Sequence, residues 1–147
     1  MIRPATDADA RAIAELEVRA WRWAYVDLVA EEDMPAVDER TRCWTGQDGV
    51  SVAEVEGRLA GVVQAADGEL KSLYVEPAAQ GAGLGAALHD LACERLRAAG
   101  YAEAVRWGCE GKGHARGYYE RRGWAPDGAR GEAAGAPEIR LRKDLRP

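Results

Sequence analysis

Apolar positions near the start of the chain recur at helical spacing. Ile13, Leu16 and Ala20 stand three and four residues apart, which places them on one face of an amphipathic helix. Thr6 is followed three residues later by Asp9, which is close to the capping box found at helix starts. The pattern predicts a first helix that begins after Thr6 and continues to about residue 28.

The middle of the chain carries three β-rich runs separated by turn signals. Gly57 with Arg58 marks one turn, and Gly68 marks the next. A shorter helix is expected before these runs, over 31–43, interrupted or started near Pro35. Short strands joined by such turns are typical of an antiparallel meander. The predicted strands are Val50–Val55, Leu59–Ala65 and Leu70–Val75.

The second half of the chain alternates helices and strands. A long helical pattern ends at Gly100 and leads to a strand over 101–108. Because a helix connects this strand to the one before it, the two strands should be parallel. The leucines on one face of the long helix are Leu84, Leu88, Leu91 and Leu96. The remaining predicted elements are a short helix over 113–123, a Gly/Ala-rich loop over 128–137 and a closing strand over 138–145.

Length and charge narrow the class of protein. A chain of 147 residues without an internal repeat predicts a single α/β domain, 1–147, with its own core. The net charge of −5 disfavours a nucleic-acid partner and mildly favours a cationic or neutral substrate. No stretch is apolar enough to span a bilayer, and the N-terminus lacks the apolar core of a signal peptide. We therefore expect a cytoplasmic protein with no membrane partner.

Cysteines and histidines show no metal-binding pattern. Cys43, Cys93 and Cys109 are widely spaced, and His89 and His114 add no cluster to them. The odd number of scattered cysteines predicts free thiols and no metal site.

Glycines at alternate positions precede the long helix. A Walker A loop needs lysine and a hydroxyl residue after its last glycine, but Ala86 and Ala87 follow Gly85. The stretch Gly81–Ala86 satisfies the dinucleotide fingerprint G-x-G-x-x-A. However, residues 77–80 separate it from the preceding strand, and no βαβαβ half follows. A third explanation is a pyrophosphate held by backbone N–H groups at the helix start, and a fourth is glycines that serve packing only.

Two motifs resemble those of the GCN5-related N-acetyltransferases, the GNAT superfamily. The stretch Gln80–Ala86 is similar to the family's Q/R-x-x-G-x-G/A loop, and 114–124 is similar to its late A-x-x-F-Y-E-x-x-G-F signature. Residues 2–25 resemble the family's opening strand and first helix. The resemblance covers nearly the whole chain. It implies a GNAT-like α/β fold with a mostly antiparallel mixed sheet, parallel splayed fourth and fifth strands, and flanking helices.

The resemblance implies acetyl-CoA as cosubstrate, with no metal. In the family, the glycine loop and helix bind the pyrophosphate, and the fourth strand pairs with the pantetheine arm. The sequence departs from the family at Lys112, where many members carry asparagine. Lys112 either meets a CoA phosphate or is a solvated loop residue. The residues implied in cofactor binding are Leu73, Tyr74, Val75, Gln80, Gly81, Ala82, Gly83, Leu84, Gly85, Ala86 and Lys112.

Acetyl transfer to an amine needs a group that accepts the amine's proton and an acid for the departing thiolate. The resemblance points to Tyr119 as the acid, with Tyr118 in the core, although Tyr119 as a mere wall of the pocket is an alternative. Glu69 stands where the histone-acetylating branch places its base, but an exposed hairpin glutamate is equally compatible. Glu76 precedes a proline at a strand end and is a weaker candidate. Many family members use water in place of a dedicated base.

Aromatic and acidic residues near the first two helices suit a cationic amine through cation–π contacts and charge. The substrate candidates are Trp21, Tyr25 and Glu31, and each is individually compatible with a structural role. We predict an acetyl-CoA-dependent N-acyltransferase that acts on a primary amine of a small molecule or peptide. The alternatives are a catalytically silent acyl-CoA sensor and, further off, a dinucleotide-binding domain. A homodimer is left open.

Overall fold

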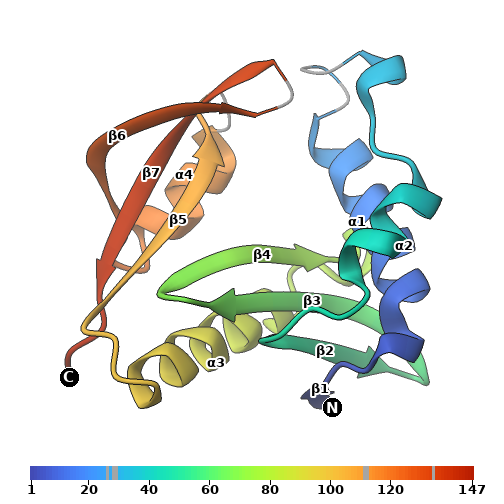
Figure 1. The fold of residues 1–147 in the computed structure, drawn as a ribbon, viewed down its shortest axis with the longest axis horizontal. Coiled ribbons are helices and arrows are strands. Elements are labelled where there is room, and N and C mark those ends of the chain that lie inside the picture. Colours follow the sequence, from blue (N-terminus) through green and yellow to red (C-terminus); the bar gives the residue numbers. More distant parts are fainter. Residues whose placement is uncertain (26, 28–29, 111–112, 134) are drawn as a thin grey trace. The chain divides into compact units, whose positions relative to one another are not determined.

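A computed structural model describes residues 1–25, 27, 30–110, 113–133 and 135–147 (Figure 1). The chain divides into two compact units. Unit 1 contains Met1–Gln64 and Ser72–Ala92, and unit 2 contains Ala65–Lys71 and Cys93–Pro147. The fourth strand and the third α-helix each contribute residues to both units.

The strands follow the order β1-β2-β3-β4-β5-β7-β6 in one seven-stranded sheet. β4 and β5 are parallel and pair at Glu69 and Val105, whereas β1–β2, β2–β3, β5–β7 and β6–β7 are antiparallel. This arrangement confirms the predicted mixed α/β class with a mostly antiparallel sheet. The strands are β1 (Ile2–Pro4), β2 (Val50–Val55), β3 (Arg58–Ala66), β4 (Glu69–Val75), β5 (Glu103–Cys109), β6 (Ala125–Ala133) and β7 (Ala136–Asp144).

The helices begin and end close to the predicted positions. The helix predicted over 31–43 is interrupted near Pro35, as expected. A 3-10 turn ends at Asp33, before the proline, and an α-helix begins at Val37, after it. Across the described residues, no helix has the length and apolar character needed to cross a membrane. The helices are η1 (Asp7–Asp9), α1 (Ala10–Tyr25), η2 (Glu31–Asp33), α2 (Val37–Trp44), η3 (Pro77–Ala79), α3 (Leu84–Ala98) and α4 (Gly113–Glu120).

Unit 1 is a sheet covered by helices on both faces. Val62 of β3 is fully buried against α1 and α2. The neighbouring Gly61 points to the other face, where an added Cβ would lie 2.7 Å from Leu88 of α3. Thus α1 and α2 cover one face, and α3 covers the other (Figure 1). The buried cluster beneath α1 contains Ala10, Ile13, Ala14, Leu16, Trp44, Val50, Val52 and Val62.

The predicted capping box stands at the start of η1, which leads directly into α1. The Thr6 N–H donates to the Asp9 carboxylate at 2.8 Å. Arg3 of β1 contacts Asp9 at 2.8 Å and Glu54 of β2 at 2.6 Å. The hydrogen bond from Arg3 lowers the pKa of Asp9 to about 2. One guanidinium therefore ties β1, β2 and the first helix together.

The meander matches the sequence prediction to within one residue at each strand end. Both turns need a left-handed backbone, with φ +77° at Gly57 and +76° at Gly68. Glycine adopts this conformation without a Cβ clash, which explains why the turn signals were reliable.

In unit 2, α4 lies against β5 and β7 (Figure 1). Leu141 of β7 is 3% exposed and pairs directly with Arg106 of β5, whose side chain contacts α4. Trp124, just after α4, is 2% exposed. This packing gives unit 2 a small core of its own.

The predicted loop over 128–137 is wrong. Residues 125–133 form β6, which pairs with β7 from Ala133–Ala136 to Ala125–Arg142. The register shifts between Pro126 and Arg130, so the strand is irregular. Pairing with a regular neighbour satisfies the backbone of a segment whose glycines and alanines have little strand preference of their own.

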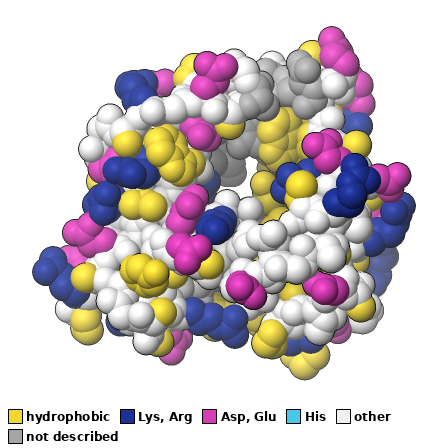
Figure 2. All heavy atoms as spheres, in the orientation of Figure 1, with side chains coloured by type: hydrophobic (Ala, Val, Ile, Leu, Met, Phe, Trp, Pro, Cys, Tyr) yellow, Lys and Arg dark blue, Asp and Glu magenta, His cyan; other side chains and the backbone are white. Residues whose placement is uncertain are grey.

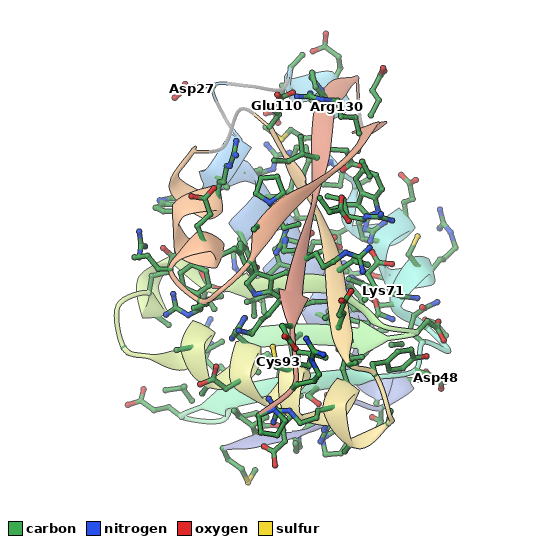
Figure 3. The ribbon with its side chains drawn as sticks, turned by 90° about the vertical axis from the view of Figure 1, so that its left-hand side faces the viewer. Asp27, Asp48, Lys71, Cys93, Glu110 and Arg130 are labelled. Carbon is green, nitrogen blue, oxygen red and sulfur yellow. The ribbon has the colours of Figure 1, made fainter. Side chains whose placement is uncertain are left out.

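Charged side chains of both signs are interspersed over the face drawn in Figure 2. Several charged side chains of unit 2 form ion pairs: Arg142 contacts Glu103 at 2.6 Å, and Arg130 contacts Glu110 at 3.0 Å. In Figure 3, Glu110 and Arg130 point toward one another.

Candidate active site

The glycine loop of unit 1 connects η3 to α3. Gly81 and Gly83 have φ of +89° and +82°, and both are exposed. A Cβ added at either position would meet nothing within 4 Å. Glycine is therefore needed here for the backbone conformation and not for close packing. The loop leaves open space on the side where a side chain would otherwise stand.

The first turn of α3 offers backbone donors. The first helical hydrogen bond recorded runs from the Ala87 N–H to the Gly83 carbonyl oxygen at 3.1 Å. The N–H groups of Leu84, Gly85 and Ala86 precede it and have no acceptor within the helix. Together with the positive end of the helix dipole, they suit an anionic group such as a pyrophosphate. The open glycine positions beside them fit the bulk of that group.

The end of β4 is half-buried in unit 1. Leu73, Tyr74 and Val75 are all of intermediate exposure, and Tyr74 packs against the cluster beneath α1. Glu76 accepts two hydrogen bonds from Arg19 of α1, at 2.7 and 2.9 Å, and its N–H donates to the Ala60 carbonyl at 2.8 Å. Glu76 thus has a structural partner, in line with its weaker candidacy as a base.

The predicted substrate residues come from the first helical region. Trp21 is half-buried on α1, and Glu31 is exposed and paired with Arg22. Tyr25 is the last residue of α1, but its side chain lies outside the described part, and Lys112 lies outside the described residues altogether.

Tyr119 of α4 is buried in unit 2, with 6% of its surface exposed. Its ring meets Trp124 edge-on at a centroid distance of 6.0 Å. The guanidinium carbon of Arg106 lies 3.8 Å from its ring centroid. Burial raises the pKa of the Tyr119 phenol, and the charge of Arg106 opposes that rise. At neutral pH the phenol is therefore protonated and able to donate.

Tyr118, which was expected in the core, is only half-buried. The Arg122 guanidinium carbon lies 3.7 Å from its ring centroid, and the two tyrosine rings meet at 80°. Tyr118 is therefore less buried than expected, and Tyr119 is the more buried of the two because the helix turns it toward the sheet.

Glu69 lies at the start of β4 and is half-buried. It pairs with Val105, so it shares the sheet face opposite α4 with Trp107 and Glu138. Burial raises the pKa of Glu138, and the charge of Glu69 adds to the effect. The two carboxylates therefore interact. The charge of Arg106 opposes the rise in the pKa of Glu138.

Sequence analysis missed three of these residues, namely Arg106, Trp107 and Glu138. All three stand on strands, where a two-residue period was the only signal available. Arg106 alternates with the apolar Val105 and Trp107, a pattern that normally places a charged side chain on the solvent face, so the sequence did not indicate that it lies beneath a helix.

Where side chains are described, no three histidine, cysteine, aspartate or glutamate residues come together as a metal site would require. Cys43 is exposed and Cys93 is buried, and neither is joined in a disulfide, as predicted. The side chain of Cys109 lies outside the described part.

Residues 15–145 match the sequence model of a family described as acetyltransferase (GNAT) domain. No curated protein sequence matches the chain. A similar solved structure is a GCN5-related N-acetyltransferase from Rhodopseudomonas palustris, with TM-score 0.83 and 18% identity over 98% of this chain and 94% of that one.

Two other similar structures were determined with ligands. PaiA N-acetyltransferase from Thermoplasma acidophilum, in complex with coenzyme A, has TM-score 0.78 and 18% identity over 98% of each chain. YncA from Salmonella typhimurium, with its cofactor acetyl-CoA, has TM-score 0.74 and 21% identity over 100% of this chain and 94% of that one. At these identities, the likeness shows a shared fold.

Proposed function

The chain belongs to the GNAT acetyltransferase family, and from this premise we propose that it transfers an acetyl group from acetyl-CoA to a primary amine of a small molecule or peptide. The observation that carries the proposal is the open loop at Gly81 and Gly83, directly before the first-turn N–H groups of α3, which have no acceptor within the helix. We assign the whole of 1–147 to this activity as one domain and propose a cytoplasmic location.

The cosubstrate supplies the acetyl group as a thioester. In the proposed mode, the loop from Gln80 to Gly83 and the first turn of α3 hold its pyrophosphate through backbone N–H groups. Leu73, Tyr74 and Val75 pair with its pantetheine arm, and an N–H near Tyr74 or Val75 stabilises the thioester oxygen. Lys112 is assigned a phosphate contact.

Tyr119 is the proposed acid. It donates its phenolic proton to the sulfur as the C–S bond breaks, while the amine nitrogen forms the new C–N bond. The ammonium loses two protons in all. Glu69, or a water it holds, accepts the first before the attack and passes it to solvent. The second leaves the nitrogen after the C–N bond forms and restores the Tyr119 phenol, so each turnover releases one proton. A glutamate side chain is among the groups that act as general bases in enzymes. Trp21, Tyr25 and Glu31 are assigned to the acceptor, which is a cationic amine before it loses its proton.

The test is a panel of primary amines with acetyl-CoA, in which the release of free thiol is measured. The parent protein should acetylate at least one class of amine. Tyr119→Phe should lower kcat at least ~10-fold, because general acid catalysis typically contributes about 10²–10⁴-fold. Its acetyl-CoA affinity should change only a few-fold, since the ring is kept.

Tyr118→Phe is the matched control, because it removes the same hydroxyl one position earlier and should leave kcat nearly unchanged. If Tyr119→Phe turns over like the parent, Tyr119 is only a wall of the pocket. If acetyl-CoA binds tightly and no amine is acetylated, the sensor alternative is the better one.

A further inference from the structure

Arg106 occupies an unusual position for an arginine. It stands on β5, and its side chain lies beneath α4 with the guanidinium carbon 3.8 Å from the Tyr119 ring centroid. Its Nη2 donates to the Trp107 carbonyl oxygen at 3.0 Å. Its Nε is buried and has no hydrogen-bond partner among the described residues. A buried, unsatisfied donor is costly, so its presence calls for a compensating role.

No carboxylate neutralises Arg106 within the part of the chain that the structure describes, although fifteen other ion pairs are recorded there. Its positive charge opposes the rise in the pKa of Glu138, and its guanidinium carbon lies 3.8 Å from the centroid of the Tyr119 ring. A cation over a tyrosine ring is attracted by the π-face, and it is attracted more strongly once the phenol becomes a phenolate.

We propose that Arg106 is a positioning residue for the acid, which holds the Tyr119 ring and stabilises the phenolate that forms when the phenol gives its proton to the thiolate. The proposal rests on the role of Tyr119 proposed above. A proton that the amine releases then returns to the phenolate, so no further reactant is needed. Because the phenolate is buried, a guanidinium at this distance matters far more than it would in water.

Other groups face Tyr119 as well. The charge of Arg122 at the end of α4 also lowers the pKa of the phenol, whereas Cys93 of α3 raises it. Arg106 has the larger of the two cationic effects. Removing Arg106 should therefore raise the pKa of the Tyr119 phenol and weaken it as an acid. The alkaline limb of the kcat profile should move to higher pH while the plateau rate falls.

The experiment compares Arg106→Gln and Arg106→Lys in the parent and in Tyr119→Phe. In the parent, Arg106→Gln should lower kcat about 10-fold and leave the KM for acetyl-CoA within a few-fold. Arg106→Lys keeps the charge and should recover most of the rate. In Tyr119→Phe, Arg106→Gln should cause no further loss, because its target is gone. An equal loss in both backgrounds would overturn the proposal and make Arg106 merely structural.

Arg122→Gln is the matched control, since Arg122 stacks on Tyr118 at 3.7 Å as Arg106 stacks on Tyr119. It should change kcat and the alkaline limb much less than Arg106→Gln does, and an equal shift would also overturn the proposal.

A readout without turnover is the tyrosinate absorbance titration, with Tyr119 identified by difference from Tyr119→Phe. A higher phenol pKa in Arg106→Gln supports the electrostatic role even where Tyr119→Phe retains full activity, in which case the acid assignment alone fails. An unchanged phenol pKa contradicts the proposal.

Discussion

Individual residues of the glycine loop hold a backbone conformation that L-residues adopt rarely. Gly83 is left-handed and exposed, with free space on its Cβ side. Gly57 in the β2–β3 turn has nearly the same φ and the same free space, but it lies in a hairpin. A substitution at Gly57 therefore measures only the cost of the left-handed backbone, whereas the same substitution at Gly83 also measures the effect on ligand binding.

We expect Gly83→Ala to weaken acetyl-CoA binding at least ~10-fold, or about 1.4 kcal/mol, because the new methyl group occupies the space assigned to the pyrophosphate. Gly83→Ala and Gly57→Ala should each lower the free energy of unfolding by about 1–2 kcal/mol, since both force a Cβ into the left-handed region. Calorimetry with acetyl-CoA and urea unfolding measure the two effects. If the two variants bind acetyl-CoA with equal affinity, the glycine loop is not part of the binding site.

Glu138 gives a residue-level pH dependence. Its folded-state pKa is raised, first by burial and then by Glu69. Because the pKa of Glu138 is higher in the folded state, its protonated form contributes to the stability of the fold. That contribution is complete below the pKa of the unfolded state and is lost as the pH rises through the pKa of the folded state. Glu138→Gln should therefore melt above the parent at pH 7, and the difference should shrink toward pH 4. Glu110→Gln, which breaks an exposed ion pair with Arg130, should show no such gain. A gain that persists unchanged at pH 4 would contradict the assignment.

Among the elements, α1 and α2 are joined by one buried carboxylate. Glu17 is 4% exposed and accepts hydrogen bonds from Arg40 at 2.8 Å and from the Trp44 indole at 2.9 Å. Both donors come from α2, so a single side chain sets the register of the two helices. Removal of the carboxylate would leave two donors without their acceptor.

Glu17→Ala should lower the free energy of unfolding by about 2–4 kcal/mol, because it breaks a buried, charge-assisted network. Glu15→Ala is the control on the same helix, since it removes only an exposed contact with Arg11 and should change stability by about 0.5 kcal/mol or less. Urea unfolding of both variants measures the difference, and similar values would mean that Glu17 does not join the helices.

The elements also show where sequence analysis succeeds. The meander was predictable because glycines with positive φ mark both turns, and the alternation between them is regular. The segment 128–137 was misinterpreted because its strand exists only through pairing with β7, which leaves no local signal. The glycine loop was found from its spacing, whereas Arg106 was not, because its partner Tyr119 is distant in sequence and contacts it only in the fold.

For the whole molecule, the proposed cosubstrate makes a direct thermodynamic prediction. Acetyl-CoA at about 100 times its Kd should stabilise the protein by about 2.7 kcal/mol through mass action. For a chain of this size, that corresponds to a rise in Tm of roughly 5–11 °C. NAD and ATP at the same concentration should raise Tm much less, because the loop lacks the groups that a Walker site needs. Equal stabilisation by NAD would revive the dinucleotide alternative.

The irregular strand β6 has a consequence for how the chain meets other copies of itself. It is the last strand in the sheet order, so no other strand of the described residues pairs with its outer edge. Pro126, the register shift that follows it, and the charges of Arg130 and Glu132 all interrupt that edge. Straight, apolar edges recruit strands from neighbouring molecules and seed fibrils, and these three features oppose such growth. The glycine-rich segment that was predicted as a loop therefore forms an edge strand whose irregular backbone and charges oppose aggregation.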